Sequence, residues 1–107
     1  MKYNESFYVV NHTSEKYQNA NDIAVKVKGA TYQKDKRLFI HRGNNCYILT
    51  DKQTGLYVVV AKTLKKLDEK FNEKIGLYNK VFNGKLYNQF KSNLKKILYE
   101  GVIAYEK

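Results

Sequence analysis

His12 and His41 are the side chains of this sequence best suited to acid and base chemistry near neutral pH. Cleavage of an RNA phosphodiester needs both roles, so a small ribonuclease that uses this pair is one hypothesis. The alternative is two polar or turn histidines, because they lie far apart in the sequence. The chain contains no glycine-rich phosphate loop, no nucleophile elbow and no cluster with metal-ligand spacing. We therefore expect a non-enzymatic protein that holds no metal and no cofactor.

Cys46 is the one cysteine of the chain, which excludes an internal disulfide and a cysteine-rich zinc site. Its place beside Tyr47, at the start of an expected strand, favours a small buried side chain over a reactive thiol. The N-terminal residues lack an apolar stretch of signal-peptide length, and the longest apolar run, 56–61, is far shorter than the roughly 20 residues of a membrane helix. We expect a cytoplasmic protein that does not engage a membrane.

The charge balance gives the broadest indication of a partner. The chain has 20 Lys and Arg against 10 Asp and Glu, a formal net charge of +10. Such a field attracts polyanions, because phosphates neutralised by lysine release their counterions. Eighteen of the cations are lysine and 11 residues are asparagine, a composition typical of AT-rich coding sequences, including those of phages and plasmids. Because only Arg37 and Arg42 are available for bidentate base reading, we expect backbone contacts rather than sequence-specific ones.

The elements that position these residues follow from the hydrophobic pattern. A chain of 107 residues suits a single small basic domain, here residues 1–107. Alternating and β-branched residues predict an antiparallel β-meander of four to five strands over residues ~6–61. The expected strands are 7–10, 23–27, 37–41, 46–50 and 56–61, with a hairpin turn at 43–45.

Helical spacing replaces this alternation after Thr63, the expected N-cap. Leu64, Leu67 and Phe71 begin an apolar stripe at steps of three and four. Gly76 interrupts the stripe, which leaves open one bent helix or two shorter helices. A second stripe comprises Leu86, Phe90, Leu94, Ile97 and Leu98. Two or three amphipathic helices over residues ~63–100 should therefore pack on one face of the sheet, in an α+β fold.

The predicted strands carry a candidate binding surface. If Leu38 and Ile40 face the helices, and Ile48 and Val58 also point inward, their neighbours share the outer face. This surface comprises Lys26, Lys28, Arg37, Phe39, His41, Tyr47 and Tyr57. Aromatic rings among cations form a stacking platform for single-stranded nucleic acid. The alternative is that the aromatics are only strand formers and cross-strand pairs, or that the helices cover this face.

The second expected helix offers a further basic patch, opposite its apolar stripe. Lys85, Lys91, Lys95 and Lys96 have no acidic residue between them. Contact with phosphates is the functional interpretation. The alternative is a solvated helix face whose lysines keep the protein soluble.

These features lead to three hypotheses from different classes. The first is a non-enzymatic binding module that engages nucleic acid, or a ribonucleoprotein, through a surface rich in lysine and tyrosine. The second is a protein-binding inhibitor or adaptor of a phage or mobile element, which blocks a host nucleic-acid-processing enzyme. The ribonuclease that uses His12 and His41 is the third. Because the run 56–61 is apolar on both sides, a homodimer is an additional hypothesis.

Overall fold

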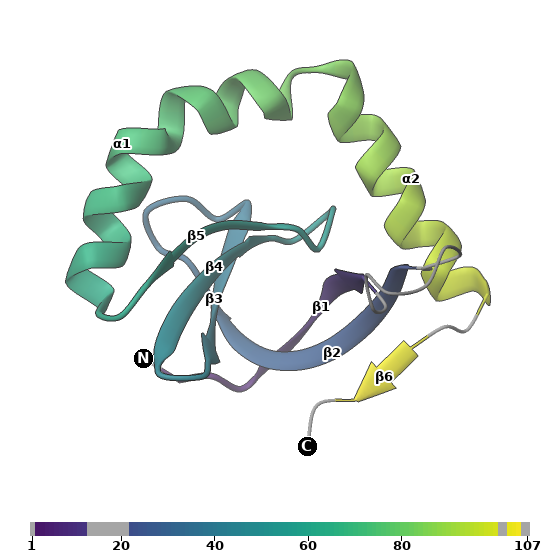
Figure 1. Cartoon of the computed structure of the whole chain (residues 1–107), viewed down its shortest axis with the longest axis horizontal. Coiled ribbons are helices and arrows are strands. Elements are labelled where there is room, and N and C mark those ends of the chain that lie inside the picture. The colour runs from purple at the N-terminus through teal and green to yellow at the C-terminus, as the bar shows by residue number, and fades with distance from the viewer. Residues whose placement is uncertain (1, 13–21, 101–102, 106–107) are drawn as a thin grey trace.

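The computed structural model describes residues 2–12, 22–100 and 103–105, and it has the expected α+β architecture. A five-strand antiparallel sheet of order β1-β2-β3-β4-β5 is followed by two helices that pack on it (Figure 1). These strands are β1 (Glu5–His12), β2 (Asp22–Thr31), β3 (Leu38–Gly43), β4 (Cys46–Asp51) and β5 (Tyr57–Ala61). The helices are α1 (Leu64–Phe82) and α2 (Lys85–Glu100), and a short strand, β6 (Ile103–Tyr105), pairs parallel to β2.

The β3–β4 hairpin determines which side chains face the helices. Its turn is the two residues 44–45, and Asn45 adopts a positive φ of 56°, which asparagine tolerates. Gly43 and Cys46 pair directly on either side of the turn. The wider turn expected from the sequence, 43–45, would shift this register by one residue. Because side chains alternate between faces, that shift would exchange the two sides of β4.

The main hydrophobic core lies between α1 and the face of the sheet below it. Ile40 of β3 pairs with Leu49 of β4, and both side chains are buried on this face. The buried cluster comprises Tyr32, Leu38, Ile40, Leu49, Val59, Ala61, Leu67, Phe71 and Tyr78. The prediction that Leu38 and Ile40 face the helices is confirmed.

α1 is a single helix with the predicted N-cap. The Thr63 hydroxyl accepts a hydrogen bond from the backbone N–H of Lys66 at 3.1 Å, and the helix continues through Gly76 without a break. On the flank above β5, the ammonium group of Lys70 donates to the backbone carbonyl of Val60 at 3.0 Å. This contact joins α1 to β5, the strand at one end of the sheet order.

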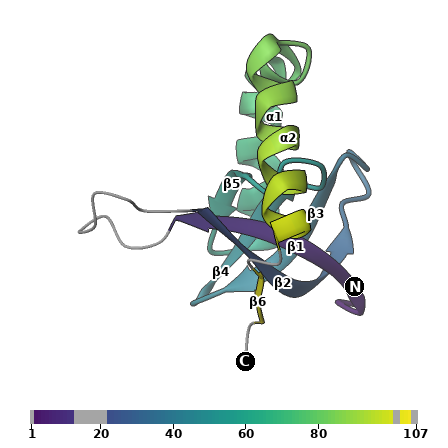
Figure 2. The ribbon, with the colours of Figure 1, turned by 90° about the vertical axis from the view of Figure 1, so that its right-hand side faces the viewer.

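α2 lies on the same side of the sheet as α1 (Figure 2), at its opposite end (Figure 1). Its buried Leu94 packs on Ala24 of β2. Tyr87 is buried, whereas Leu86 is 59% exposed and Phe90 is 36% exposed. The predicted apolar stripe is therefore correct at Leu94 and wrong at Leu86, because α2 turns its Tyr87 side toward the sheet.

The sheet curls until the face opposite the helices becomes an interior (Figure 1). Phe7 of β1 stacks on Phe39 of β3, with the ring centroids 4.2 Å apart. The backbone N–H of Val10 in β1 donates to the carbonyl of Gly55, in the β4–β5 loop, at 2.9 Å. Gly55 has a φ of 72°, and a Cβ there would lie 3.1 Å from the Val10 nitrogen, so any other residue would be strained at this contact. β1 thereby covers a face that a flat sheet would expose.

Candidate functional site

Two members of the predicted aromatic surface lie inside the curled sheet. Phe39 and His41 are both buried. The ring of Phe39 stacks on Phe7, and the Nε2 atom of His41 lies 3.0 Å from the hydroxyl oxygen of Thr50. The prediction of an open platform that includes Phe39 and His41 is therefore wrong. The physical reason is curvature, because β1 folds over this face.

Burial lowers the pKa of His41 to about 4, so its imidazole is neutral at pH 7. The ring borders a hollow of about 260 Å³ that is lined by β1 and β5 residues such as Val9 and Val60. A neutral, buried imidazole beside a threonine hydroxyl is poorly placed to exchange protons with a substrate. The side chain of His12 lies outside the described residues. The position of His41 therefore does not favour the ribonuclease hypothesis.

The two tyrosines of the predicted surface have different environments. Tyr47 pairs with Arg42 across the hairpin and packs half-buried against the main core, on the helix-facing side. Tyr57 is 72% exposed at the start of β5. The prediction that Tyr47 lies on the outer face is wrong, because Leu49 rather than Ile48 points toward the helices.

The lysines of the predicted surfaces are distributed around the molecule. Lys28 of β2 is exposed and donates to the Ser6 hydroxyl at 2.9 Å, and Lys26 is half-buried. On α2, Lys85, Lys95 and Lys96 are exposed. Lys91 is half-buried, and its ammonium group lies 5.6 Å from the centre of the Tyr87 ring. The structure does not bring these lysines together in one site.

Arg37 is the centre of a tightly bonded cluster between the β2–β3 loop and α1. Its guanidinium forms an ion pair with Asp35 and donates to the side-chain oxygen of Asn79 at 2.7 Å. It also lies over the rings of Tyr78 and Phe82, 4.6 and 4.7 Å from their centres. The guanidinium holds the pKa of the Asp35 carboxyl below its ordinary value. Arg37 is therefore fixed in position.

A cavity of about 420 Å³ opens beside this fixed guanidinium, and we call it the basic cavity. Its lining residues are Asp35, Lys36, Arg37, Lys52, Gln53, Phe82 and Tyr87. Three cationic residues thus line a cavity with one carboxylate, and that carboxylate is engaged with Arg37. The ammonium group of Lys52 also donates to the hydroxyl of Thr31 at 2.9 Å. The arrangement suits an anion with an adjoining flat or apolar group.

The sequence prediction missed Lys36 and Lys52, because both lie in loops rather than on a strand or helix face. The signal that could have found the cavity is the segment 34–37, which has three cations in four residues.

Asp51 joins both helices to the sheet beside this cavity. Its buried carboxylate accepts hydrogen bonds from the hydroxyls of Tyr78 in α1 and Tyr87 in α2, the latter at 2.9 Å. It also accepts from the backbone N–H groups of Gln53 and Thr54, at 2.8 and 2.9 Å. Burial, followed by these bonds to Asp51, raises the pKa of both phenols. The network fixes the junction of the two helices.

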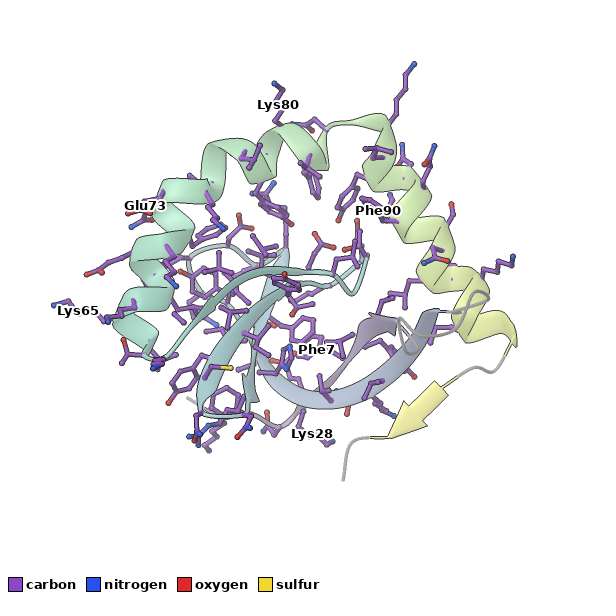
Figure 3. All side chains as sticks on the ribbon, viewed as in Figure 1. Phe7, Lys28, Lys65, Glu73, Lys80 and Phe90 are labelled. Atoms are coloured by element: carbon purple, nitrogen blue, oxygen red, sulfur yellow. The ribbon has the colours of Figure 1, made fainter. Side chains whose placement is uncertain are left out.

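A second hollow, of about 240 Å³, lies on another side of Tyr87, and we call it the apolar groove. Its lining residues are Asp51, Thr54, Leu56, Tyr57, Val58, Lys74, Leu77, Tyr78, Val81, Tyr87 and Phe90. Figure 3 shows Phe90 on the side of α2 that faces the sheet, while Lys65, Glu73 and Lys80 point outward from α1. The groove carries large apolar side chains that remain partly exposed.

No protein-family model, no curated protein and no solved structure matches this chain. Within residues 2–12, 22–100 and 103–105, no three side chains of His, Cys, Asp or Glu gather as metal ligands. None of the helices in that part of the chain is long and apolar enough to cross a membrane. The functional argument therefore depends on the two hollows and the surface charge.

Proposed function

We propose that the protein is a non-enzymatic module that binds the phosphate backbone of nucleic acid, with the basic cavity as its anchor. The observation that carries this proposal is the convergence of Lys36, Arg37 and Lys52 on one hollow with two aromatic rings. Arg37 is pre-oriented by its ion pair, so little conformational freedom is lost when it meets a phosphate. The half-buried ring of Phe82 offers apolar surface for a sugar or base next to that phosphate.

The remaining surface supports the same ligand. The formal net charge is +10, and exposed lysines on β2 and α2 extend the positive field beyond the cavity. Because lysine is a point charge without a bidentate fork, these contacts suit phosphates rather than particular bases. The expected binding is strongly dependent on salt and weakly dependent on sequence.

The test is a fluorescence polarisation titration with labelled single-stranded RNA, single-stranded DNA and duplex DNA, each at low and at physiological salt. Affinity should fall steeply as salt rises. The double variant Lys36→Gln/Lys52→Gln should weaken binding and reduce the salt slope by about one for each lysine removed. Arg37 is unsuitable for this test, because its substitution would also break the contacts to Asp35 and Asn79.

A matched control is Lys65→Gln/Lys66→Gln, which removes the same charge from exposed positions at the start of α1 that do not line the cavity. This control should change the salt slope much less. If the two double variants have equal effects, binding depends only on the overall positive charge, and the proposal that the basic cavity anchors the phosphate is contradicted. Absence of binding to every probe at low salt would contradict the proposed function itself.

A further inference from the structure

The apolar groove has the composition of a docking surface for another protein chain. Leu77 and Val81 of α1, Phe90 of α2 and Tyr57 of β5 line it, and Leu77 is 64% exposed. Isolated apolar side chains are common on protein surfaces, but a contiguous set around a hollow indicates an interaction site. None of these residues belongs to the basic cavity, so the argument is independent of nucleic-acid binding.

The shape of the groove favours a helical occupant. Leu77 and Val81, one turn apart on α1, form a short apolar row along the groove, and Phe90 of α2 lines it with them. Such rows are the ridges against which the side chains of a further helix pack. The groove borders the junction that Asp51 fixes, so its walls are in place before a partner arrives.

The charges around the groove determine which helix fits. Lys74 is the one cation among the described residues that line it. Among the described lining residues the one carboxylate is Asp51, which is buried and already accepts four hydrogen bonds. A partner with acidic residues flanking its apolar face would therefore be complementary. A second copy of this chain is disfavoured, because each copy has a net charge of +10.

We propose that the apolar groove binds an acidic amphipathic helix of a partner protein. The partner's leucine-like side chains would fill the space between Leu77, Val81 and Phe90, and its Asp or Glu residues would face Lys74. In this arrangement the protein carries a protein-binding site in addition to its basic cavity.

The test uses the full chain and a synthetic helical peptide with leucines along one face and glutamates flanking them. Binding is measured by calorimetry, and the contact surface is mapped by amide chemical-shift changes. Leu77→Ser should weaken binding by about tenfold or more, the amount expected for losing a buried leucine. The amide shifts should concentrate in the second half of α1, the first half of α2 and β5.

Two matched controls separate the groove from general stickiness and general charge. Val60→Ser removes an exposed apolar residue that borders the hollow beside His41, and it should leave peptide binding unchanged. Lys74→Glu should weaken binding of the acidic peptide more than Lys65→Glu, which makes the same charge reversal at the start of α1. Leu77 is mostly exposed, so its replacement by serine should leave the thermal melt unchanged.

Three results would overturn the proposal. One is no binding of the acidic peptide to the folded protein. Another is equal binding of a peptide whose leucines are replaced by serine, which would indicate charge attraction alone. The last is concentration-dependent self-association that Leu77→Ser abolishes, since this would assign the groove to a second copy of the chain.

Discussion

Asp51, the last residue of β4, accepts a hydrogen bond at 2.9 Å from the hydroxyl of Tyr87, in the first turn of α2. Tyr78 of α1 donates to the same carboxylate. One buried acid thus connects both helices to the sheet, and the basic cavity and the apolar groove lie on either side of this connection. The stability of both candidate sites depends on it.

Replacement of this acid should be costly. Asp51→Asn keeps the size of the side chain but places an NH2 group where one oxygen accepts hydrogen bonds, so buried donors lose their partner. We expect urea denaturation to show a loss of about 2 to 4 kcal/mol in the free energy of unfolding. The control is Asp68→Asn, which removes a partly exposed ion pair with Lys34. Its remaining side-chain oxygen can still accept the hydrogen bond from the Tyr32 hydroxyl, so the substitution should cost less than about 1 kcal/mol. Similar losses for both variants would contradict the central role of Asp51.

His41 should make the fold sensitive to acid. Its pKa is about 4 in the folded protein and near 6.5 in an unfolded chain, so below pH 6.5 the unfolded state takes up a proton that the folded state refuses. The contribution of His41 to the free energy of unfolding is therefore fully present above pH 6.5 and decreases as the pH falls toward 4. The total loss from this group is about 3 kcal/mol.

The variant His41→Gln isolates this contribution, because glutamine can still bond to Thr50 and does not titrate. Urea denaturation of the parent and the variant at pH 7, 5.5 and 4 should show a shallower pH dependence for the variant. Parallel curves would mean that His41 takes up its proton in the folded state.

Tyr47→Ala and Tyr57→Ala distinguish a core residue from a surface residue. Tyr47 packs against the main core, so its truncation should lower the free energy of unfolding by about 1 to 3 kcal/mol. Tyr57 is 72% exposed, and its truncation should change that free energy by less than about 0.5 kcal/mol. Thermal melts of the two variants measure the difference, and the reverse order would mean that the assigned register of β4 is incorrect.

Two glycines should respond in opposite directions to substitution by alanine. At Gly76, on the exposed side of α1, a Cβ meets no atom within 4 Å, so Gly76→Ala should stabilise the protein by about 1 kcal/mol. At Gly29 of β2, a Cβ would lie 2.6 Å from the backbone oxygen of Ile40, and Gly29→Ala should destabilise by about 1 to 3 kcal/mol. Circular dichroism melts provide the comparison. A loss at Gly76 would indicate a bend in α1.

The fold was largely predictable because its signals are local. The alternation of apolar and polar residues predicts the meander, and the helical spacing of Leu67, Phe71 and Tyr78 predicts α1. The helix-facing side of β3 followed from Leu38 and Ile40. These patterns need no knowledge of distant contacts.

The candidate site was harder to predict, because it depends on register and curvature. Treating 43–45 as the turn makes Ile48 an inward residue, whereas the actual turn 44–45 makes Leu49 inward and moves Tyr47 to the helix side. The stacking of Phe7 on Phe39 depends on how far the sheet curls, which no short stretch of sequence encodes. The hollows combine residues from loops and from both helices, so only the assembled fold brings them together.

The bond from Lys70 to the carbonyl of Val60 has a consequence for behaviour at high concentration. β5 ends the sheet path, and terminal strands are templates on which other chains can add a strand and begin to aggregate. A charged ammonium held 3.0 Å from that backbone oxygen must be displaced, and partly dehydrated, before a foreign strand can pair there. α1 therefore does more than bury the core, because its Lys70 also hinders the addition of a foreign strand to β5 and the fibrous self-assembly that could follow.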